Sequence, residues 1–152
     1  MAERSVTHTT FTLERSYDAP PAKVFKAFAD PAIKRRWFVE GEGWEVDEFV
    51  SDFKTGGVER SRFRFKGGEP IRNDTSYHDI VPNERIIFAY TMTIGEKRIS
   101  ASLATCEFKP SGAGTQFVFT EQGAFLDGLD SAGPREGGWK ELLDALGRSL
   151  KS

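Results

Sequence analysis

Apolar and polar residues alternate over most of the chain up to residue 122, and a period of two is typical of half-buried β-strands. In the first such segment, residues 8–17, one face is formed by Phe11, Leu13, Arg15 and Tyr17. Six further segments are predicted as strands, over residues 44–49, 58–66, 71–81, 85–94, 98–108 and 115–122, and of these residues 71–81 form a polar strand. Turn-forming glycine, proline and asparagine residues separate most of these segments. The pattern predicts seven strands at the spacing of an antiparallel sheet.

Three segments have helical spacing instead. Two short helices follow the first strand: one begins at Pro20 and Pro21, and the next begins at Asp30, which can cap it, and Pro31. Their apolar residues are Val24, Phe25, Phe28, Ile33, Trp37 and Phe38. The third helix starts near Gly133 and carries a single apolar stripe, formed by Trp139, Leu142, Leu143, Leu146 and Leu150.

The elements therefore follow the order strand, two short helices, six strands and a long C-terminal helix. Adjacent strands with helices set apart indicate the α+β class rather than a parallel β–α–β fold. One helix must then cover one long sheet, and a curved sheet that closes over a helix tends to enclose a cavity. Gly137 and Gly138 interrupt this helix, although each costs about 1 kcal/mol relative to alanine. Close approach of the sheet or of a ligand explains them, unless they lie in a frayed first turn.

Length and composition fit one domain over residues 1–152, of which residues 1–7 are expected to be flexible. The 21 basic and 23 acidic residues are nearly balanced, whereas dedicated nucleic-acid-binding proteins usually have a basic excess. A single cysteine forms no internal disulfide, as is usual in a reducing cytosol. The chain lacks the roughly 20-residue apolar segment of a membrane span and the apolar region of a signal peptide. These features predict a cytoplasmic protein without a membrane span.

Few residues suit catalysis or metal binding. The two histidines, His8 and His78, have no spacing typical of a metal site, and no glycine-rich cofactor loop occurs, so neither a metal nor a cofactor is expected. The chain also offers a Cys106–His78 nucleophile pair, but a buried inert thiol is the better interpretation. The reason is that alternation places His78 on the strand face opposite Tyr77.

Arg15 is the charged residue of most interest, because it alternates with the apolar side chains of its strand. A buried arginine needs a carboxylate partner, since an unpaired buried charge is strongly unfavourable. Glu59 and Glu121 alternate with phenylalanines in the same way and are the two candidates. We expect an Arg15–Glu121 pair within or beside the cavity. The alternative is that Arg15 lies near the strand end and extends along its stem to solvent.

Several short motifs also occur in a distinctive order. They comprise Glu14-Arg15-Ser16-Tyr17-Asp18-Ala19-Pro20, Asp30-Pro31 with Arg36-Trp37-Phe38, Gly56-Gly57, Glu84-Arg85-Ile86, Thr120-Glu121-Gln122-Gly123-Ala124-Phe125, and Gly138-Trp139 with Leu142-Leu143. With these motifs, residues 8–150 resemble the helix-grip fold of the START and Bet v-type (SRPBCC) superfamily. Within it, the chain is similar to the AHSA-type family, named for homologues of the activator of heat-shock chaperone ATPase. The resemblance implies a seven-stranded sheet wrapped around the C-terminal helix, with a hydrophobic cavity between them.

Residues on the predicted inner faces are candidates for the cavity wall, with packing in the core as the alternative for each. Tyr77, Tyr90 and Trp139 are favoured, since each joins an apolar body to one polar group. The expected ligand-binding residues are Arg15, Trp37, Phe38, Phe63, Phe65, Tyr77, Phe88, Tyr90, Met92, Phe117, Phe119, Glu121, Phe125, Trp139 and Leu143.

Three functions are compatible with this resemblance. The first is binding, without catalysis, of a small hydrophobic molecule such as a lipid or polyketide-like compound, which requires a cavity of roughly a few hundred Å³ with convergent polar groups. The second is an interaction module for a chaperone or another protein, which requires a small or collapsed cavity and an exposed apolar patch. The third is a cyclase-like or hydrolytic enzyme, which requires an acid or base with a perturbed pKa. The protein is expected to be a monomer or homodimer.

Overall fold

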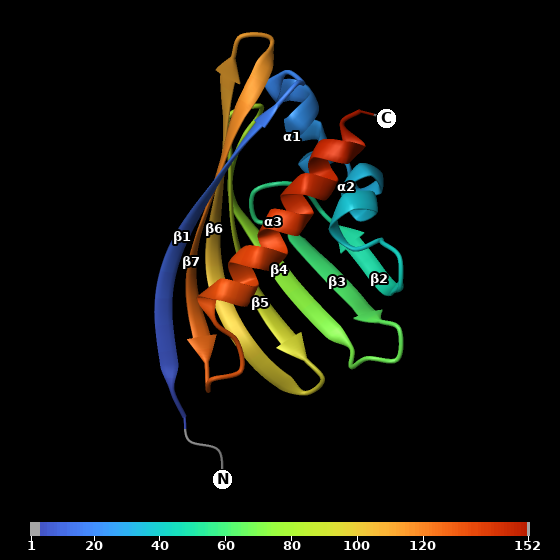
Figure 1. Ribbon diagram of the computed structural model, residues 1–152, viewed down its shortest axis with the longest axis vertical. Coiled ribbons are helices and arrows are strands. Elements are labelled where there is room, and N and C mark those ends of the chain that lie inside the picture. Colours follow the sequence, from blue (N-terminus) through green and yellow to red (C-terminus); the bar gives the residue numbers. More distant parts are fainter. Residues whose placement is uncertain (1–3, 152) are drawn as a thin grey trace.

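The computed structural model describes residues 4–151. Figure 1 shows one curved antiparallel sheet, with the C-terminal helix lying across it and two short helices near one end. The strands are β1 (Val6–Tyr17), β2 (Trp44–Ser51), β3 (Val58–Phe65), β4 (Ile71–Val81), β5 (Arg85–Ile94), β6 (Lys97–Ser111) and β7 (Gly114–Leu126). The helices are α1 (Pro21–Ala29), α2 (Pro31–Phe38) and α3 (Ala132–Ser149). The predicted α+β helix-grip fold with seven strands is confirmed.

The strands lie in the order β1-β7-β6-β5-β4-β3-β2, so the first two strands of the chain occupy opposite edges of the sheet. The helices α1 and α2 make this crossing. Register shifts interrupt the ladders between Val46 and Glu48 in β2, between Tyr77 and Asp79 in β4, and between Met92 and Thr93 in β5. Such irregularities increase strand twist and bending, which helps the sheet to curve around α3.

The core lies between the inner face of the sheet and the three helices. The predicted apolar stripe of α3 faces the sheet, and Trp139, Leu143 and Leu146 are buried. Trp139 packs on Phe119 of β7 with ring centroids 4.2 Å apart. The Tyr17 hydroxyl at the end of β1 donates a hydrogen bond to the Leu143 carbonyl oxygen at 2.7 Å. Packing and one buried hydrogen bond therefore fix the middle of α3 against the sheet.

The short helices α1 and α2 close one end of this core. Phe28 of α1 stacks on Phe117 of β7, with ring centroids 5.6 Å apart, and meets Trp37 of α2 edge-on. The predicted capping role of Asp30 is confirmed, because its side chain accepts a hydrogen bond from the Ala32 amide at 2.9 Å. A short capped helix with proline in its first turn is thereby held at a defined angle to α1.

Several element boundaries differ from the prediction. β1 begins at Val6 rather than at residue 8, and β7 continues to Leu126, which places Phe125 in a strand rather than in a loop. Arg4 and the Ser5 amide both bond the Asp127 carboxylate, so residues 4–7 of the segment expected to be flexible are attached to the end of β7. Residues 1–3 lie outside the described residues. Among residues 4–151, none of the helices combines the length and apolar character that crossing a bilayer requires.

Candidate functional site

A cavity of about 540 Å³ lies between the sheet and the helices α2 and α3. Strands β3 to β6 form its floor, and α3 forms part of its roof. Its exposed lining residues belong mainly to α3 and to residues 40–44, which identifies the gap between these two segments as the opening. The volume is in the range of small-molecule sites.

The structure brings seven of the fifteen predicted site residues together on the cavity wall. They are Trp37, Phe38, Phe63, Phe88, Tyr90, Met92 and Trp139. The other eight lie outside the lining: Arg15, Phe65, Tyr77, Phe117, Phe119, Glu121, Phe125 and Leu143. The cavity wall therefore includes fewer of the predicted residues than expected, and those residues come mainly from β5, α2 and α3.

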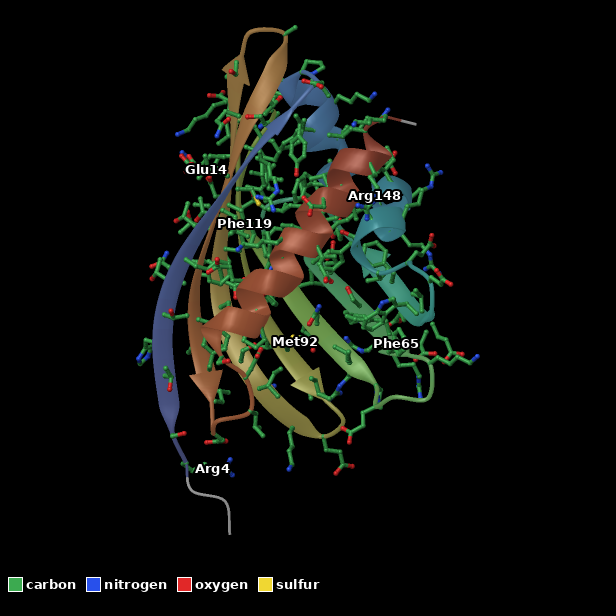
Figure 2. All side chains as sticks on the ribbon, viewed as in Figure 1. Arg4, Glu14, Phe65, Met92, Phe119 and Arg148 are labelled. Carbon is green, nitrogen blue, oxygen red and sulfur yellow. The ribbon has the colours of Figure 1, made fainter. Side chains whose placement is uncertain are left out.

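Five apolar residues outside the lining have one of two environments. Phe117, Phe119, Phe125 and Leu143 are completely or almost completely buried in the packed core beside the cavity. Phe65 is 51% exposed and packs on the Trp44 ring near the edge of the sheet. Figure 2 shows Phe65 toward the β2–β3 edge, well apart from Met92 beneath α3. The alternation therefore assigns these side chains to the inner face of the sheet correctly. It does not show which of them pack in the core, which line the cavity and which lie at the edge of the sheet.

Arg135 of α3 forms a buried ion pair with Glu121 of β7 at one side of the cavity. The guanidinium Nη1 lies 3.0 Å from Glu121 Oε2, and Nη2 lies 2.8 Å from Asp130 Oδ2. Tyr90 and Ser102 also donate hydrogen bonds to the Glu121 carboxylate, at 2.7 and 2.9 Å. Burial raises the pKa of the Tyr90 hydroxyl, and the Glu121 charge raises it further, so this hydroxyl stays a donor. We call Arg135, Glu121, Asp130, Tyr90 and Ser102 the Arg135 cluster.

A second buried ion pair joins Lys34 of α2 to Glu59 of β3. The Lys34 ammonium lies 2.8 and 3.0 Å from the two carboxylate oxygens, and it stands 4.6 Å above the Phe38 ring. Tyr77 and Ser51 donate hydrogen bonds to Glu59 Oε1 at 2.7 and 2.9 Å. Burial lowers the pKa of Lys34, but the charges and hydrogen bonds of Glu59 and Tyr77 outweigh burial and raise it. We call Lys34, Glu59, Tyr77 and Ser51 the Lys34 cluster.

The predicted Arg15–Glu121 pair is wrong. Arg15 lies 3.2 Å from Asp144 on the outer side of α3, and its side chain is 27% exposed. The alternative that we weighed, in which Arg15 extends to solvent, is closer to the structure. Glu59 and Glu121 do face inward as the alternation indicated, but their cations come from helices. The pattern could not identify Lys34 and Arg135, because the docking of a helix decides which of its polar residues enter the core.

The glycines of α3 differ in their surroundings. Gly138 lines the cavity, and a side-chain carbon placed on it would meet no heavy atom within 4 Å. Both glycines are exposed, but Gly137 is not part of the lining, so Gly138 lies at the opening of the cavity. Both lie inside α3 rather than in a frayed first turn, and close approach of the sheet requires neither of them.

The Cys106 thiol is completely buried in the core, whereas His78 is exposed, so the two do not form a nucleophile pair. Within the described part of the chain, no three side chains of the metal-binding types are placed to hold a metal ion.

Stability is expected to fall in alkaline solution from about pH 8 upward. Burial raises the pKa of Cys106 and of Tyr77 to about 12, from ordinary values of 9.0 and 10.0. The folded state therefore keeps protons that the unfolded state releases, so this stabilisation is complete below about pH 8 and is lost as pH rises toward 12. Between pH 8 and pH 11, urea unfolding should show a loss of at least about 2 kcal/mol.

Cys106→Ala provides the control for this pH dependence. It should remove most of the decline between pH 8 and pH 9 and reduce the decline above pH 9, because the Cys106 thiol has an ordinary pKa of 9.0 and ionises in the unfolded chain before Tyr77, whose ordinary pKa is 10.0. A wild-type free energy of unfolding that stays constant to pH 11 would contradict the expectation.

Together, the curved sheet, the covering helix and the cavity between them define a protein of the helix-grip class. The chain belongs to the family of Activator of Hsp90 ATPase homolog 1-like proteins, whose model matches residues 18–151. No protein with a curated description matches the chain.

Solved structures of high similarity include two proteins from Rhizobium species. The Mll3558 protein of Rhizobium loti is 53% identical with a TM-score of 0.89, over 95% of this chain and 99% of that chain. A putative uncharacterized protein from Rhizobium leguminosarum is 44% identical with a TM-score of 0.94, over 98% of each chain. DynU16, a putative protein in the dynemicin biosynthetic locus, is 17% identical with a TM-score of 0.69 and shares the fold alone. The alignment with DynU16 covers 94% of this chain and 47% of that chain.

Proposed function

We propose that this protein binds a small hydrophobic molecule in the cavity between the sheet and α3, without catalysing a reaction on it. The observation that supports this best is Gly138, which lies on the cavity wall in the middle of the covering helix. Glycine there costs about 1 kcal/mol relative to alanine. Neither contact with the sheet nor a left-handed backbone requires it. The helix thus gives up stability at a position where a side chain would reduce the cavity volume.

The composition of the wall supports the same function. Trp37, Phe38, Phe88 and Trp139 offer aromatic surface, and a few polar groups are interspersed among them. An apolar wall with few, fixed polar groups is typical of small-molecule sites. The acid or base needed for an enzyme has less support, since Lys34, Glu59, Tyr90 and Arg135 are already engaged in buried ion pairs and hydrogen bonds.

An interaction module is the competing interpretation, and it requires a small or collapsed cavity. The volume of about 540 Å³ weighs against that requirement. Trp44 and Phe65 are exposed and touch each other, but Trp44 also lines the cavity near its opening. Their exposure therefore fits an entrance to the cavity as well as a contact surface for a chaperone or another protein.

Gly138→Leu is expected to abolish binding of an uncharged hydrophobic probe. The added side chain would occupy the cavity, and we expect the Kd for N-phenyl-1-naphthylamine to rise at least about 100-fold, equivalent to about 3 kcal/mol. The melting temperature should be unchanged or higher, because leucine is a better helix former than glycine. Fluorescence titration and thermal unfolding measure the two effects.

Gly137→Leu is the matched control, because it makes the same change one residue away, at an exposed position that does not line the cavity. It should keep wild-type affinity for the probe. Equal affinities of folded Gly138→Leu and wild-type protein would show that the probe binds elsewhere, and the proposal would then fail.

A further inference from the structure

We propose that the ligand of this cavity is an uncharged apolar molecule bearing a hydroxyl or amide group, and that this group pairs with the side-chain amide of Asn73. This inference rests on the proposed function, because it specifies the ligand of the same site. Two independent observations support it: a buried amide without a partner, and the distribution of charge around the cavity.

Asn73 lies in the middle of β4, lines the cavity and is 8% exposed. Its Oδ1 atom is buried and has no hydrogen-bond partner within residues 4–151. Its neighbours across the ladder are Ser61 of β3 and Met92 of β5. The Ser61 hydroxyl is itself buried without a partner, so this neighbour does not satisfy the amide. Buried polar groups are nearly always hydrogen-bonded, and a ligand in the cavity would provide what the protein lacks.

The side-chain amide of Asn73 offers a donor and an acceptor side by side, and it carries no charge. A ligand hydroxyl can satisfy either atom, and a ligand amide can satisfy both at once. Rotation of the Asn73 amide by half a turn exchanges its donor and acceptor, so the site adapts to both groups. The chemistry of this residue therefore favours a neutral hydrogen-bonding group on the ligand.

The charges around the cavity disfavour an anionic ligand. Both buried cations are already neutralised: Lys34 contacts both Glu59 oxygens, and Arg135 contacts Glu121 and Asp130. In these two clusters, three carboxylates face two cations. The complete lining also has an acidic excess, with five acidic and three basic side chains, Glu40, Glu42, Glu59, Asp130, Glu141, Lys34, Arg135 and Arg148. Arg148, the third cation of the lining, is exposed rather than buried. A carboxylate entering the cavity as far as Asn73 would therefore lose its hydration without finding a buried unpaired cation.

Three naphthalene probes of nearly equal shape test this inference. 2-Naphthamide carries an uncharged amide, which offers a donor and an acceptor. In 2-naphthoate a carboxylate takes the place of the amide, and in 2-isopropylnaphthalene an apolar isopropyl group does. Each probe competes with N-phenyl-1-naphthylamine for the full chain at pH 7.5. We expect the wild-type protein to bind 2-naphthamide at least about 10-fold more tightly than 2-naphthoate.

Asn73→Leu removes the amide while nearly keeping its shape. The affinity for 2-naphthamide should fall about 10-fold, the range of one lost hydrogen bond to a buried group. The affinity for 2-isopropylnaphthalene should be unchanged or higher. Asn73→Val is the second variant if leucine disturbs the fold, because β-branched residues suit a strand interior. Ser61→Ala is the control, since Ser61 is the unpartnered neighbour that does not line the cavity.

The outcomes separate this inference from the proposed function. If no probe, including N-phenyl-1-naphthylamine, binds the wild-type protein, then the proposed function fails and the inference fails with it. If the apolar probes bind but 2-naphthamide is insensitive to both Asn73 variants, the inference is overturned while the proposed function stands. Tighter binding of 2-naphthoate than of 2-naphthamide would overturn it in the same way.

Discussion

Replacing Arg135 with methionine is expected to destabilise the protein by about 3–5 kcal/mol. The substitution leaves Glu121 completely buried without a cation, because the remaining contacts of its carboxylate are the neutral hydroxyls of Tyr90 and Ser102. It also removes the hydrogen bonds from the guanidinium to Ser100 and Asp130, at 2.6 and 2.8 Å. Urea unfolding followed by tryptophan fluorescence measures the change, as a lower midpoint with an unchanged slope.

Arg15→Met is the matched control. It removes a partly exposed ion pair between Arg15 of β1 and Asp144, which belongs to α3 like Arg135. Its cost should stay below about 1 kcal/mol, as for other exposed ion pairs. The double variant Arg135→Met with Glu121→Leu should recover most of the loss, because it removes the completely buried charge of Glu121. Asp130 still loses its cation, but its side chain is 13% exposed and can be hydrated. A single-variant cost near that of Arg15→Met would show that Glu121 finds another partner or becomes hydrated.

The Arg135 cluster also links the covering helix to the function. Arg135 belongs to α3, while Glu121 and Tyr90 belong to β7 and β5, so the cluster attaches the first half of the helix to the sheet. Trp139 extends this attachment by donating a hydrogen bond from its indole to the Tyr90 hydroxyl at 3.2 Å. Tyr90 and Trp139 both line the cavity. Loss of the cluster should therefore loosen the wall on which the proposed ligand rests.

Alternation along the strands predicted the fold and half of each buried ion pair. It correctly placed Glu59 and Glu121 on the inner face of the sheet, because successive strand residues point to opposite sides. The same reasoning assigned Arg15 as the cation that pairs with Glu121. In the structure, Arg15 lies on the edge strand β1 and bonds Asp144 of α3 instead. A strand pattern contains no information about how a helix is rotated when it docks.

The limits of the aromatic predictions have a similar physical cause. Phe63 and Phe65 share a face by sequence, but β3 lies next to the edge strand β2, and only Phe63 reaches the cavity. Phe117 and Phe119 also point inward, yet Phe28 and Trp139 cover them completely. Whether an inward side chain meets a helix, a cavity or an open edge depends on the position of its strand in the sheet. That position follows from the three-dimensional topology rather than from periodicity.

Two features of the site did leave a signal in the sequence. Gly137 and Gly138 violate helix propensity inside a strongly periodic helix, and one of them lies on the cavity wall. Asn73 belongs to a strand whose inward positions, Thr75 and Tyr77 among them, are polar rather than aliphatic. Residues that break a local rule in an otherwise consistent element are candidates for function. The glycines were recognised in this way, and the polar inner face of β4 was not.

Replacing Glu59 with leucine is expected to destabilise the protein by about 3–5 kcal/mol as well. It would leave the Lys34 ammonium, on a residue that is 3% exposed, with the Tyr77 hydroxyl and the rings of Phe38, Tyr77 and Phe88 as neutral partners. These neutral groups do not balance a full charge that has lost its hydration. The expected loss is therefore much larger than for Glu48→Leu, which removes an exposed pair with Arg60 in the neighbouring part of the sheet.

The double variant Glu59→Leu with Lys34→Met distinguishes a stabilising ion pair from one that is merely costly to break. Because both charges disappear, we expect the free energy of unfolding to return to within about 1 kcal/mol of the wild-type value. The comparison uses urea unfolding at pH 7, where the raised pKa of Lys34 keeps it protonated in the folded state. If the double variant stays as unstable as Glu59→Leu alone, then the carboxylate acts through Tyr77 and Ser51 rather than through Lys34. Recovery would instead show that the Lys34 cluster contributes little net stability, which favours a role in shaping the polar side of the cavity.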